Sequence, residues 1–435
     1  MTMVKTMDLL FTSAHIIDPA AGVDAVRDIR IEHGLITAIG EDLSTGGLER
    51  VDLHGALVFP GFMDMHVHAR EPGYEYKETI ATCAAAAAAG GFTAVLTMPN
   101  TNPPADDASV IRTVIERGME ALGGAVDVYP AGTVTSGRKG TALAPLAELW
   151  DAGARAFTDD GAPVASGGIL RLALEYTKMF EGVILQHCED LTLSAGGLVH
   201  EGAVSTQLGL PGCPAIAEEA CLARDLRIVE FTGGRYHAQH LSCAASVHMI
   251  KDAKLSGLHV TAEVTPHHLT LHDEVLRSFN PNTKVNPPLR SKDDMMALRE
   301  GLRDGVIDVI ATDHAPHSFD EKEVEFAAAP FGIVGLETAI GLVITEIVGT
   351  GYLPLQRLPE VFSYNPRRIL GLPIVKIAEG EKANLTIVDP TIAWKVDPAL
   401  FHSRSRNTPF AGRALVGKAV GIYNHGKVFL GPELR

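Results

Sequence analysis

The stretch FPGFMDMHVHAREPG, residues 59–73, places two histidines at the end of an apolar run. His66 and His68 are two positions apart, so on a β-strand both side chains would point to the same side of the sheet. Arg70 follows two positions later and could bind an anion beside them. Pairs of this kind also occur on ordinary half-exposed strands, so a metal site requires further ligands from elsewhere in the chain.

Apolar runs alternate with helical patterns over most of the chain that surrounds this stretch. The intervening segments have lengths and Ala, Leu, Glu and Arg contents suited to helices; examples are Lys77 to Ala89, Ser109 to Leu122, Ala215 to Phe231 and Asp293 to Asp304. Eight strand–helix units in about 310 residues predict an α/β fold, a (β/α)8 TIM barrel. The eight runs are residues 58–68, 92–100, 125–135, 154–160, 182–190, 236–242, 259–268 and 306–317.

Both ends of the chain have a different pattern, with short alternating segments separated by turns that contain Gly, Asp or Pro. Examples are DIRIEHGLITAIG near the start and ALVGKAVGIYNHGKVFL near the end. Such segments are typical of small antiparallel strands. We expect the two ends to meet as one small β-sandwich domain. The predicted division is therefore 1–57 and 371–435 for the two parts of the β domain, and 58–370 for the barrel.

Charge and composition limit the possible functions. The 435 residues include 37 basic and 53 acidic side chains, a net charge of −16, and 46% are hydrophobic, which is enough for a sizeable core. The acidic balance offers no broad basic surface for nucleic acid or anionic lipid. It still allows an anionic small-molecule substrate, because a local cationic pocket can outweigh a diffuse negative surface.

Cysteine usage and apolar segments indicate a cytoplasmic protein. The five cysteines are an odd number without C-x-x-C spacing, which favours a reducing compartment, and residues 1–20 lack the pattern of a secretory signal. Residues 79–105 carry no charge, but they contain six consecutive alanines, then two glycines and three prolines. This segment predicts a buried helix, a turn and a short strand, and we reject a membrane span.

Metal-binding residue types stand at the ends of several apolar runs. In a barrel the carboxyl ends of all strands converge on one face, where the active sites of this fold lie. Imidazole and carboxylate groups suit zinc, and six ligands can hold two ions that share a bridge and activate a hydroxide. The candidates are His66, His68, one residue of the pair Asp159-Asp160, His187, His240 and Asp313.

Other residues of the same types fit a structural role better. We interpret Asp159 as a helix cap, and we assign His267 and His268 to structure. Glu189 and Asp190 follow a candidate ligand and could support it, although a solvated loop explains them equally well. The remaining histidines interpreted as structural are His54, His200, His237, His248, His259, His402 and His425.

The motifs together resemble those of the amidohydrolase superfamily and, within it, of the type I dihydroorotases. Besides DMHVHAREPG they are TMPNTNPP, AFTDDG, HCED, TAEVTPHHL, VNPPLRS, IATDHAPH and APFGIVGLET, which are spread over essentially the whole chain. The resemblance implies that His66, His68 and Asp313 bind one zinc ion and that His187 and His240 bind a second. Asp160 would bridge the two ions, because AFTDDG offers no lysine for the carbamylated bridge of many relatives. The missing lysine argues against the hydantoinase and allantoinase branches.

The resemblance also implies a reaction, the reversible cyclisation of N-carbamoyl-L-aspartate to L-dihydroorotate in de novo pyrimidine (UMP) biosynthesis. Asp313 would be the catalytic acid and base. Ala69 replaces a usually larger apolar residue, and the charged loop 315–332 could close over substrate. The implied substrate contacts are His68, Arg70, Asn100, Asn286, His317, Phe331 and Gly332.

Two other functions stay open at this stage. One is hydrolysis of other cyclic amides, as in hydantoinases, which would not need the residues that bind a substrate carboxylate. The other is a non-catalytic scaffold for aspartate transcarbamoylase; such relatives lack zinc ligands, whereas all six positions are filled here. A homodimer and an association with aspartate transcarbamoylase are further expectations of the resemblance.

Overall fold

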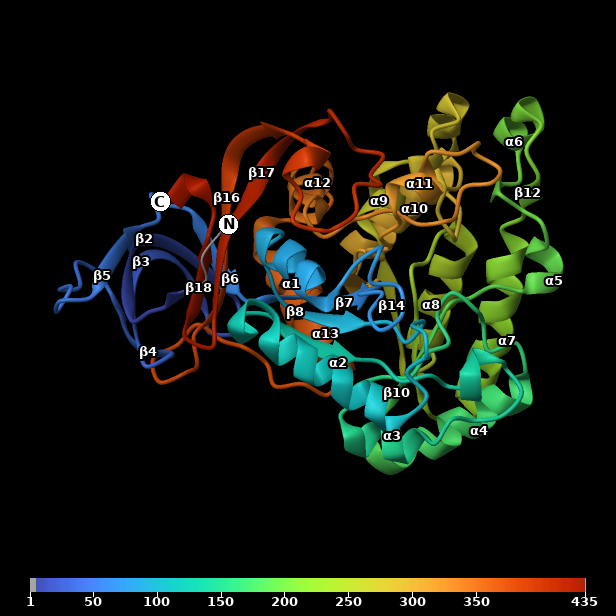
Figure 1. Ribbon diagram of the computed structural model, residues 1–435, viewed down its shortest axis with the longest axis horizontal. Coiled ribbons are helices and arrows are strands. Elements are labelled where there is room, and N and C mark those ends of the chain that lie inside the picture. The colour runs from blue at the N-terminus through green and yellow to red at the C-terminus, as the bar shows by residue number, and fades with distance from the viewer. Residues whose placement is uncertain (1–4, 435) are drawn as a thin grey trace.

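The computed structural model describes residues 5–434, and its centre consists of parallel strands (Figure 1). One sheet has the order β7-β8-β9 and another the order β10-β13-β14-β15, and every pair of neighbours is parallel. Seven of the eight predicted runs therefore contain a strand. Their bounds are β7 (Phe62–Val67), β8 (Phe92–Thr97), β9 (Asp127–Pro130), β10 (Val183–Gln186), β13 (Arg235–Ala238), β14 (Val260–Val264) and β15 (Val309–Ile310).

The fourth predicted run, residues 154–160, forms isolated bridges in place of a regular strand. Phe157 makes parallel bridges to Gly132 on one side and to Ile184 on the other, so this run lies between the two parallel sheets. On the opposite side, Val67 makes a parallel bridge to His314. The two sheets are thus connected at both edges.

Helices follow most of the strands and cover the outside of the sheets (Figure 1). Four of them coincide with the predicted helical segments to within a few residues: α1 (Ile80–Ala89), α2 (Ala108–Glu120), α7 (Ile216–Thr232) and α10 (Lys292–Arg303). The helix α1 begins at Thr79, whose side chain accepts a hydrogen bond from the Thr82 N–H in a capping box. The other helices here are α3 (Leu146–Ala152), α4 (Gly167–Thr177), α8 (Ala244–Leu255), α12 (Ala339–Val343) and α13 (Asn365–Ile369).

The uncharged segment 79–105 is helix α1, a turn and strand β8, as predicted. Gly91 makes the turn with a φ of +86°, a conformation that favours glycine. Among residues 5–434, no helix combines the length and the apolar character that crossing a membrane requires.

Two excursions at the carboxyl ends of the strands were not predicted. Between β10 and α7 lie α5 (Leu191–Ser194), β11 (Val199–His200), α6 (Ala203–Leu208) and β12 (Gly212–Cys213), with β11 and β12 paired in parallel. After β14 come the short helix α9 (Pro266–Thr270) and two 3-10 turns, η4 (Asp273–Ser278) and η5 (Pro281–Thr283). The helix α11 (Phe319–Lys322) lies within the charged loop that follows β15.

The two ends of the chain build one nine-stranded sheet. Most of its strand pairs are antiparallel, as the sequence pattern predicts, but β2 pairs in parallel with β5 and β6. Its order is β1-β18-β17-β16-β6-β2-β3-β4, with β5 paired to β2. The first and last strands, β1 and β18, are antiparallel neighbours. The bounds are β1 (Lys5–Thr6), β2 (Leu9–Asp18), β3 (Val23–Glu32), β4 (Leu35–Gly40), β5 (Glu49–Asp52), β6 (Leu57–Pro60), β16 (Asn384–Lys395), β17 (Ala414–Asn424) and β18 (Lys427–Leu430).

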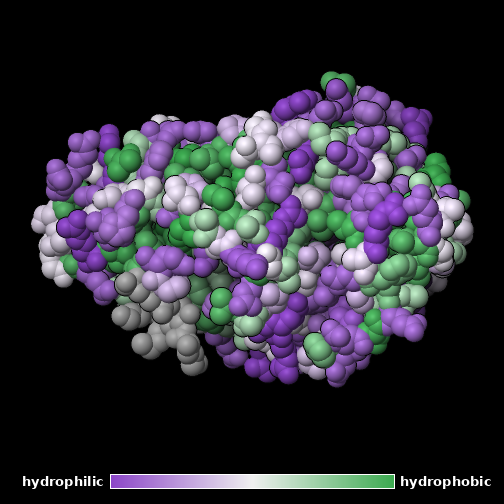
Figure 2. Space-filling view, turned by 90° about the horizontal axis from the view of Figure 1, so that it is seen from above, coloured by the Kyte–Doolittle hydropathy of each residue, from purple (hydrophilic) through white to green (hydrophobic). Residues whose placement is uncertain are grey.

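This sheet curves around its own apolar core. Phe11 on β2 and Tyr423 on β17 meet edge to face, with ring centroids 6.3 Å apart, although two strands separate β2 from β17 in the sheet. A flat sheet would keep these strands far apart, because neighbouring strands are about 4.8 Å from each other. The face shown in Figure 2 alternates hydrophilic and hydrophobic residues over both parts of the molecule.

Candidate metal centre

Five of the six candidate ligands form two clusters that share Asp160. His66 and His68 lie with Asp160 in one cluster, and His187 and His240 lie with it in the other. Within each cluster the ligand atoms are all less than 4.8 Å from one another. The six side chains, with Asp313 included, are buried and come from the carboxyl ends of the central strands or the turns after them. A shared carboxylate between two histidine pairs is the arrangement that a bridging ligand requires.

Asp313, the sixth candidate, lies beside the two histidines of the first cluster. His66 Nε2 lies 3.4 Å from Asp160 Oδ1 and 3.5 Å from Asp313 Oδ1. His68 Nε2 lies 3.0 Å from Asp313 Oδ1 and 3.4 Å from Asp160 Oδ2. Both histidines therefore turn the same nitrogen toward the same two carboxylates, as the spacing of two predicts.

In the second cluster the two imidazole rings are nearly perpendicular and meet through one nitrogen of each. His187 Nδ1 lies 2.9 Å from His240 Nε2. Asp160 Oδ1 is 3.6 Å from His240 Nε2 and 3.9 Å from His187 Nδ1. Asp160 thus presents its Oδ1 atom to both clusters.

Hydrogen bonds outside the clusters determine which nitrogen His66 and His187 offer. His66 Nδ1 contacts Glu263 Oε1 at 2.6 Å, and His187 Nε2 contacts Glu189 Oε2 at 2.9 Å. An ionised carboxylate only accepts hydrogen bonds, so in each pair the histidine donates its N–H, and in the neutral form of the ring the other nitrogen carries the lone pair. That second nitrogen is the one turned toward the clusters, which is what a metal ion needs from imidazole.

Two atoms at the centre of the first cluster have no hydrogen-bond partner. His66 Nε2 and Asp160 Oδ1 are buried, unpaired and 3.4 Å apart. Buried polar atoms without a partner are costly, and a cation between them would satisfy both. Two ligands at about 2.1 Å from one tetrahedral ion are separated by roughly this distance. The donor set and its spacing therefore fit a metal ion.

The charges within the centre keep its carboxylates ionised. Burial would raise the pKa of Asp160, but the neighbouring His66, His240 and His68 lower it well below its ordinary value. Asp313 behaves in the same way: burial opposes its ionisation, whereas His66 and His68 lower its pKa. Conversely, burial disfavours a charged His66, but Asp160 and Glu263 raise its pKa. An ionised Asp313 can both bind a cation and accept a proton.

The predicted substrate residues form a wall beside the metal centre. The Arg70 guanidinium lies 3.5 Å from His317 Nε2, and its Nε donates to the Pro316 carbonyl at 3.1 Å. His317 Nε2 in turn contacts the Phe331 carbonyl at 2.8 Å. Gly332 has a φ of +118°, and an added Cβ would come within 2.7 Å of the Ala315 Cβ, so only glycine fits there.

Two amides connect this wall to the ligands. Asn100 Oδ1 accepts from His68 Nδ1 at 2.9 Å, which leaves His68 Nε2 for the cluster. Asn286 Nδ2 donates to Glu189 Oε2 at 3.0 Å. The structure therefore brings every predicted site residue into one region, although the chain separates some of them by more than 200 positions.

One residue has a different role from the predicted one. We expected Asp159 to cap a helix, and that prediction is wrong. Its Oδ1 accepts hydrogen bonds from the backbone N–H groups of Val134 and Thr135, at 2.9 and 3.0 Å, and the next helix is capped by Ser166. Asp159 therefore fixes the loop after β9 against the turn that carries Asp160.

His267 and His268, which we interpreted as structural, differ in their contacts. His268 contacts Thr265 Oγ1 at 2.8 Å and the Pro287 carbonyl at 3.0 Å, which supports a structural role. His267 is buried and its Nε2 has no partner within the described residues, so its structural role stays a prediction.

Sequence reasoning missed Glu263 and left Glu189 undecided. Glu263 is fully buried; its Oε1 binds His66 and its Oε2 binds His237 at 3.1 Å. Burial opposes its ionisation, but His66 and His237 lower its pKa to about 2. The sequence did offer one signal for Glu263: it lies within an apolar run whose strand ends at the face of the metal centre. A carboxylate buried there requires a cationic or hydrogen-bond-donating partner.

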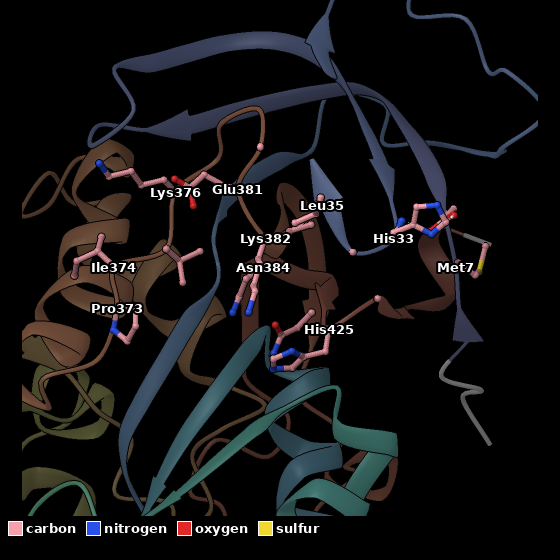
Figure 3. A pocket seen from close by; sticks show the side chains of 17 residues that line it. Met7, His33, Leu35, Pro373, Ile374, Lys376, Glu381, Lys382, Asn384 and His425 are labelled. Carbon is pink, nitrogen blue, oxygen red and sulfur yellow. Dashed lines mark hydrogen bonds and ion pairs between the residues drawn. The ribbon is translucent and has the colours of Figure 1, made fainter. Parts of the chain in front are cut away.

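Other concave or ligand-rich regions of residues 5–434 are less suited to this chemistry. Cys188, Cys221 and Asp225 lie close together, but the Asp225 carboxylate already binds Arg224 at 2.6 Å and Tyr236 at 2.9 Å. A cavity of about 1060 Å³ opens between the terminal sheet and residues 373–384, and Figure 3 shows its lining. It contains none of the site residues, and its charged side chains are of both signs: Lys376, Lys382, Asp8 and Glu381.

The fold and the shared-carboxylate ligand set define a metal-dependent hydrolase of the amidohydrolase type. The family model described as Dihydro-orotase-like matches residues 55–246. Similar proteins include the dihydroorotase of Pelotomaculum thermopropionicum, 52% identical over 94% of this chain and 96% of the relative, and that of Syntrophus aciditrophicus, 47% identical over 97% and 99%. The chain belongs to the dihydroorotase family.

Solved structures with the same fold come from a neighbouring branch. The L-hydantoinase of Arthrobacter aurescens has a TM-score of 0.83 at 25% identity and covers 98% of this chain and 96% of its own. The dihydropyrimidinase of Brevibacillus agri has a TM-score of 0.82 at 21% identity over 98% and 95%. These similarities confirm a mixed α/β fold of the amidohydrolase kind, consisting of a barrel-type core and a β domain.

Proposed function

We propose that this protein is a dihydroorotase that interconverts N-carbamoyl-L-aspartate and L-dihydroorotate in de novo pyrimidine biosynthesis. The observation that carries the proposal is the Arg70 guanidinium beside the metal centre, 3.5 Å from His317. Dihydroorotate carries a carboxylate that takes no part in the ring chemistry, and a guanidinium can bind it through two parallel hydrogen bonds. Cyclic amides without that group have no use for such a residue.

The ligand geometry supports two zinc ions per chain. His66, His68 and Asp313 would hold one, His187 and His240 the other, and Asp160 would bind both. When bound, the ions supply Lewis-acid activation of a water molecule and of the amide carbonyl. The donor set of four imidazoles and two carboxylates is the kind that zinc prefers.

Asp313 moves the proton of the reaction. In ring opening it accepts a proton from the attacking water and passes it to the leaving ring nitrogen, acting as base and then as acid. In ring closure it removes a proton from the ureido nitrogen. Its lowered pKa supports the ionised form that begins the ring-opening step.

The substrate wall orients the ring for this transfer. Arg70, Asn100 and His317 would bind the free carboxylate, and Asn286 with the backbone at Phe331 and Gly332 would hold the edge of the ring. His68 lies between the two groups, because it contacts both Asn100 and Asp313. Fixing the substrate in this way would restrict its internal rotations to those that bring the ureido nitrogen and the carboxyl carbon together.

We also propose a closed (β/α)8 barrel over residues 58–370 and a β-sandwich from residues 1–57 and 371–435, of which 1–4 and 435 lie outside the described residues. The bridges of Phe157 and Val67 support the closure, and the Phe11–Tyr423 contact supports the sandwich. A homodimer, an association with aspartate transcarbamoylase and a cytoplasmic location complete the proposal. The five cysteines, all buried and unpaired, support a reducing compartment.

The experiment that tests the function combines metal analysis with an ultraviolet assay of dihydroorotate consumption. Protein purified without chelators should contain two zinc equivalents per chain. Removal of zinc with a chelator should abolish the activity, and added zinc should restore it. A preparation that consumes no dihydroorotate with its metal sites filled would contradict the proposal.

A second candidate is hydrolysis of cyclic amides without a carboxylate, which the fold of the Arthrobacter aurescens L-hydantoinase favours. The same assay with hydantoin and dihydrouracil separates the two candidates. We expect kcat/KM for dihydroorotate to exceed that for either compound, because neither engages Arg70. A higher kcat/KM for hydantoin would favour the second candidate.

A further inference from the structure

We propose that Glu189 is a positioning residue that couples the metal ligand His187 to the substrate-binding amide of Asn286. Only the part of this proposal that concerns Asn286 and the substrate rests on the proposed function. Glu189 is in the turn after β10, two positions beyond His187, whereas Asn286 comes from the segment between η5 and α10. The carboxylate therefore connects two parts of the chain that are almost 100 positions apart.

A single oxygen of Glu189 makes both contacts. Its Oε2 lies 2.9 Å from His187 Nε2 and 3.0 Å from Asn286 Nδ2. The two donors are 3.4 Å from each other. The three groups are thus mutually in contact, and a shift of the carboxylate would move both donors at once.

Glu189 is too enclosed to be a solvated loop residue. Its side chain is 13% exposed and that of His187 is 4% exposed. Within residues 5–434 no lysine or arginine forms an ion pair with Glu189, so its partners are the imidazole, the amide and Ser194.

On the metal side, Glu189 fixes the tautomer and the plane of His187. Because Oε2 accepts the Nε2 proton, Nδ1 keeps its lone pair and points toward His240 and Asp160. A carboxylate partner also makes the imidazole a stronger ligand, and loss of such partners typically weakens metal binding about 10- to 100-fold.

On the substrate side, Glu189 fixes the rotation of the Asn286 amide. Nδ2 is committed to the carboxylate, so Oδ1 points the other way and presents an acceptor to the ring N–H of a substrate. Without Glu189 the amide could rotate and present either group. Glu189 therefore acts on the substrate only through Asn286.

Glu263 provides a matched control on the other side of the centre. It binds the ligand His66 in the same manner, at 2.6 Å, but its second oxygen binds His237, which is part of the core. Glu263→Gln should change zinc affinity without a specific effect on Asn286. Of these two carboxylates, only Glu189 connects a ligand to the substrate wall.

A double-mutant cycle on the full-length protein tests the coupling. Zinc affinity is measured by chelator competition without substrate, and KM and kcat are measured with dihydroorotate at saturating zinc. Glu189→Ala should weaken zinc about 10-fold or more and raise KM. Asn286→Ala should raise KM and leave zinc affinity unchanged, and the double variant should have the same KM as Asn286→Ala alone.

Glu189→Gln keeps an acceptor oxygen in place and controls for misfolding of the alanine variant. Its KM should stay close to that of the wild type, because the glutamine oxygen still accepts a hydrogen bond from Asn286. Its zinc affinity should fall, because the negative charge beside His187 is removed. The coupling is wrong if the KM effects of Glu189→Ala and Asn286→Ala multiply, or if zinc affinity is unchanged in both Glu189 variants. If the wild type consumes no dihydroorotate, the proposed function fails, while the zinc measurement still decides the role of Glu189 toward His187.

Discussion

Asp313 occupies a strained backbone position directly after the last central strand. Its φ is +48°, and this conformation turns the carboxylate back toward His68 Nε2 at 3.0 Å and His66 Nε2 at 3.5 Å. The same carboxylate is thus close to the ligands and free to exchange a proton with a substrate.

Asp313→Asn preserves the shape of this side chain and removes its ability to accept a proton. We expect kcat to fall by about 10²–10⁴-fold, the usual contribution of a positioned acid or base. Steady-state kinetics with dihydroorotate measure the effect, and zinc content is determined on the same sample because Asp313 is also a candidate ligand. A fully metallated variant with nearly wild-type kcat would exclude the proton-transfer role.

Arg70 should discriminate between substrates and leave the chemistry intact. Arg70→Ala removes a hydrogen-bonded charge worth about 1.5–3 kcal/mol, so kcat/KM for dihydroorotate should fall by roughly 10- to 150-fold. Hydrolysis of dihydrouracil, which lacks the carboxylate, should change little. Equal losses on both compounds would instead assign Arg70 a structural role through its contact with the Pro316 carbonyl.

At this scale the sequence predicts which candidate ligands lie together, but it does not predict their hydrogen-bond partners. His66, His68 and Asp313 could be found because strand periodicity and the common face of strand ends determine where such residues point. Asp159 and Glu263 could not be assigned from sequence, since Asp159 binds the loop after β9 and Glu263 binds His66 on β7. Only the packed structure shows which backbone N–H or imidazole lies opposite each carboxylate.

The charged loop after β15 is held against the segment around η5 by two buried lysines. Lys284 Nζ donates to the carbonyls of Ala327 and Ala329 at 2.9 and 2.7 Å. Lys322 Nζ donates to those of Pro281 and Pro330 at 3.1 and 2.7 Å. These contacts fix the part of the loop that carries the predicted substrate residues Phe331 and Gly332.

Lys322 should give this loop a measurable pH dependence. Burial, and next the charge of Lys284, lower the pKa of Lys322 from 10.5 to about 7, while Glu321 opposes the shift. Below pH 7 the folded and unfolded chains both carry the charge, and folding bears the full cost of burying it. Between pH 7 and 10 the folded chain holds a neutral amine, which can still donate two hydrogen bonds, while the unfolded chain stays charged.

The free energy of unfolding should therefore rise with pH more in the wild type than in Lys322→Met. Urea denaturation at pH 7, 8, 9 and 10 measures this difference. The comparison between the two proteins cancels the titration of groups that do not interact with Lys322; Lys284 and Glu321 do interact with it. Parallel pH profiles would mean that Lys322 keeps an ordinary pKa.

At the scale of elements, long periodic segments were predictable and irregular ones were not. The helices α1, α2, α7 and α10 follow from clear helical patterns. The pattern of the run 154–160 predicts a strand, but the run forms only the bridges of Phe157. Its last residues turn away, Asp159 to the loop after β9 and Asp160 into the candidate metal centre. The insertion that contains β11 and β12 has strands of two residues, too short to leave a pattern.

At the scale of the whole molecule, one buried hydroxyl connects the terminal sheet to the central strands. Thr386 on β16 accepts from the Phe62 N–H at 2.9 Å and donates to the Gly91 carbonyl at 2.7 Å. The short alternating segments at both chain ends predicted that they would form one β domain. Its attachment to the starts of β7 and β8 was not predictable, because a single threonine leaves no periodic signal.

Two tryptophans allow this attachment to be tested, since Trp150 lies in α3 and Trp394 in β16. Thr386→Val leaves the Phe62 N–H and the Gly91 carbonyl buried without partners, which should cost about 1–3 kcal/mol for each group. Thr386→Ser retains the hydroxyl and should cost less. Urea unfolding is followed through Trp150 in a Trp394→Phe background and through Trp394 in a Trp150→Phe background. If the hydroxyl couples the two parts, Thr386→Val should lower the unfolding midpoint seen by both probes equally. A shift seen only through Trp394 would mean that the terminal sheet unfolds independently of the central strands.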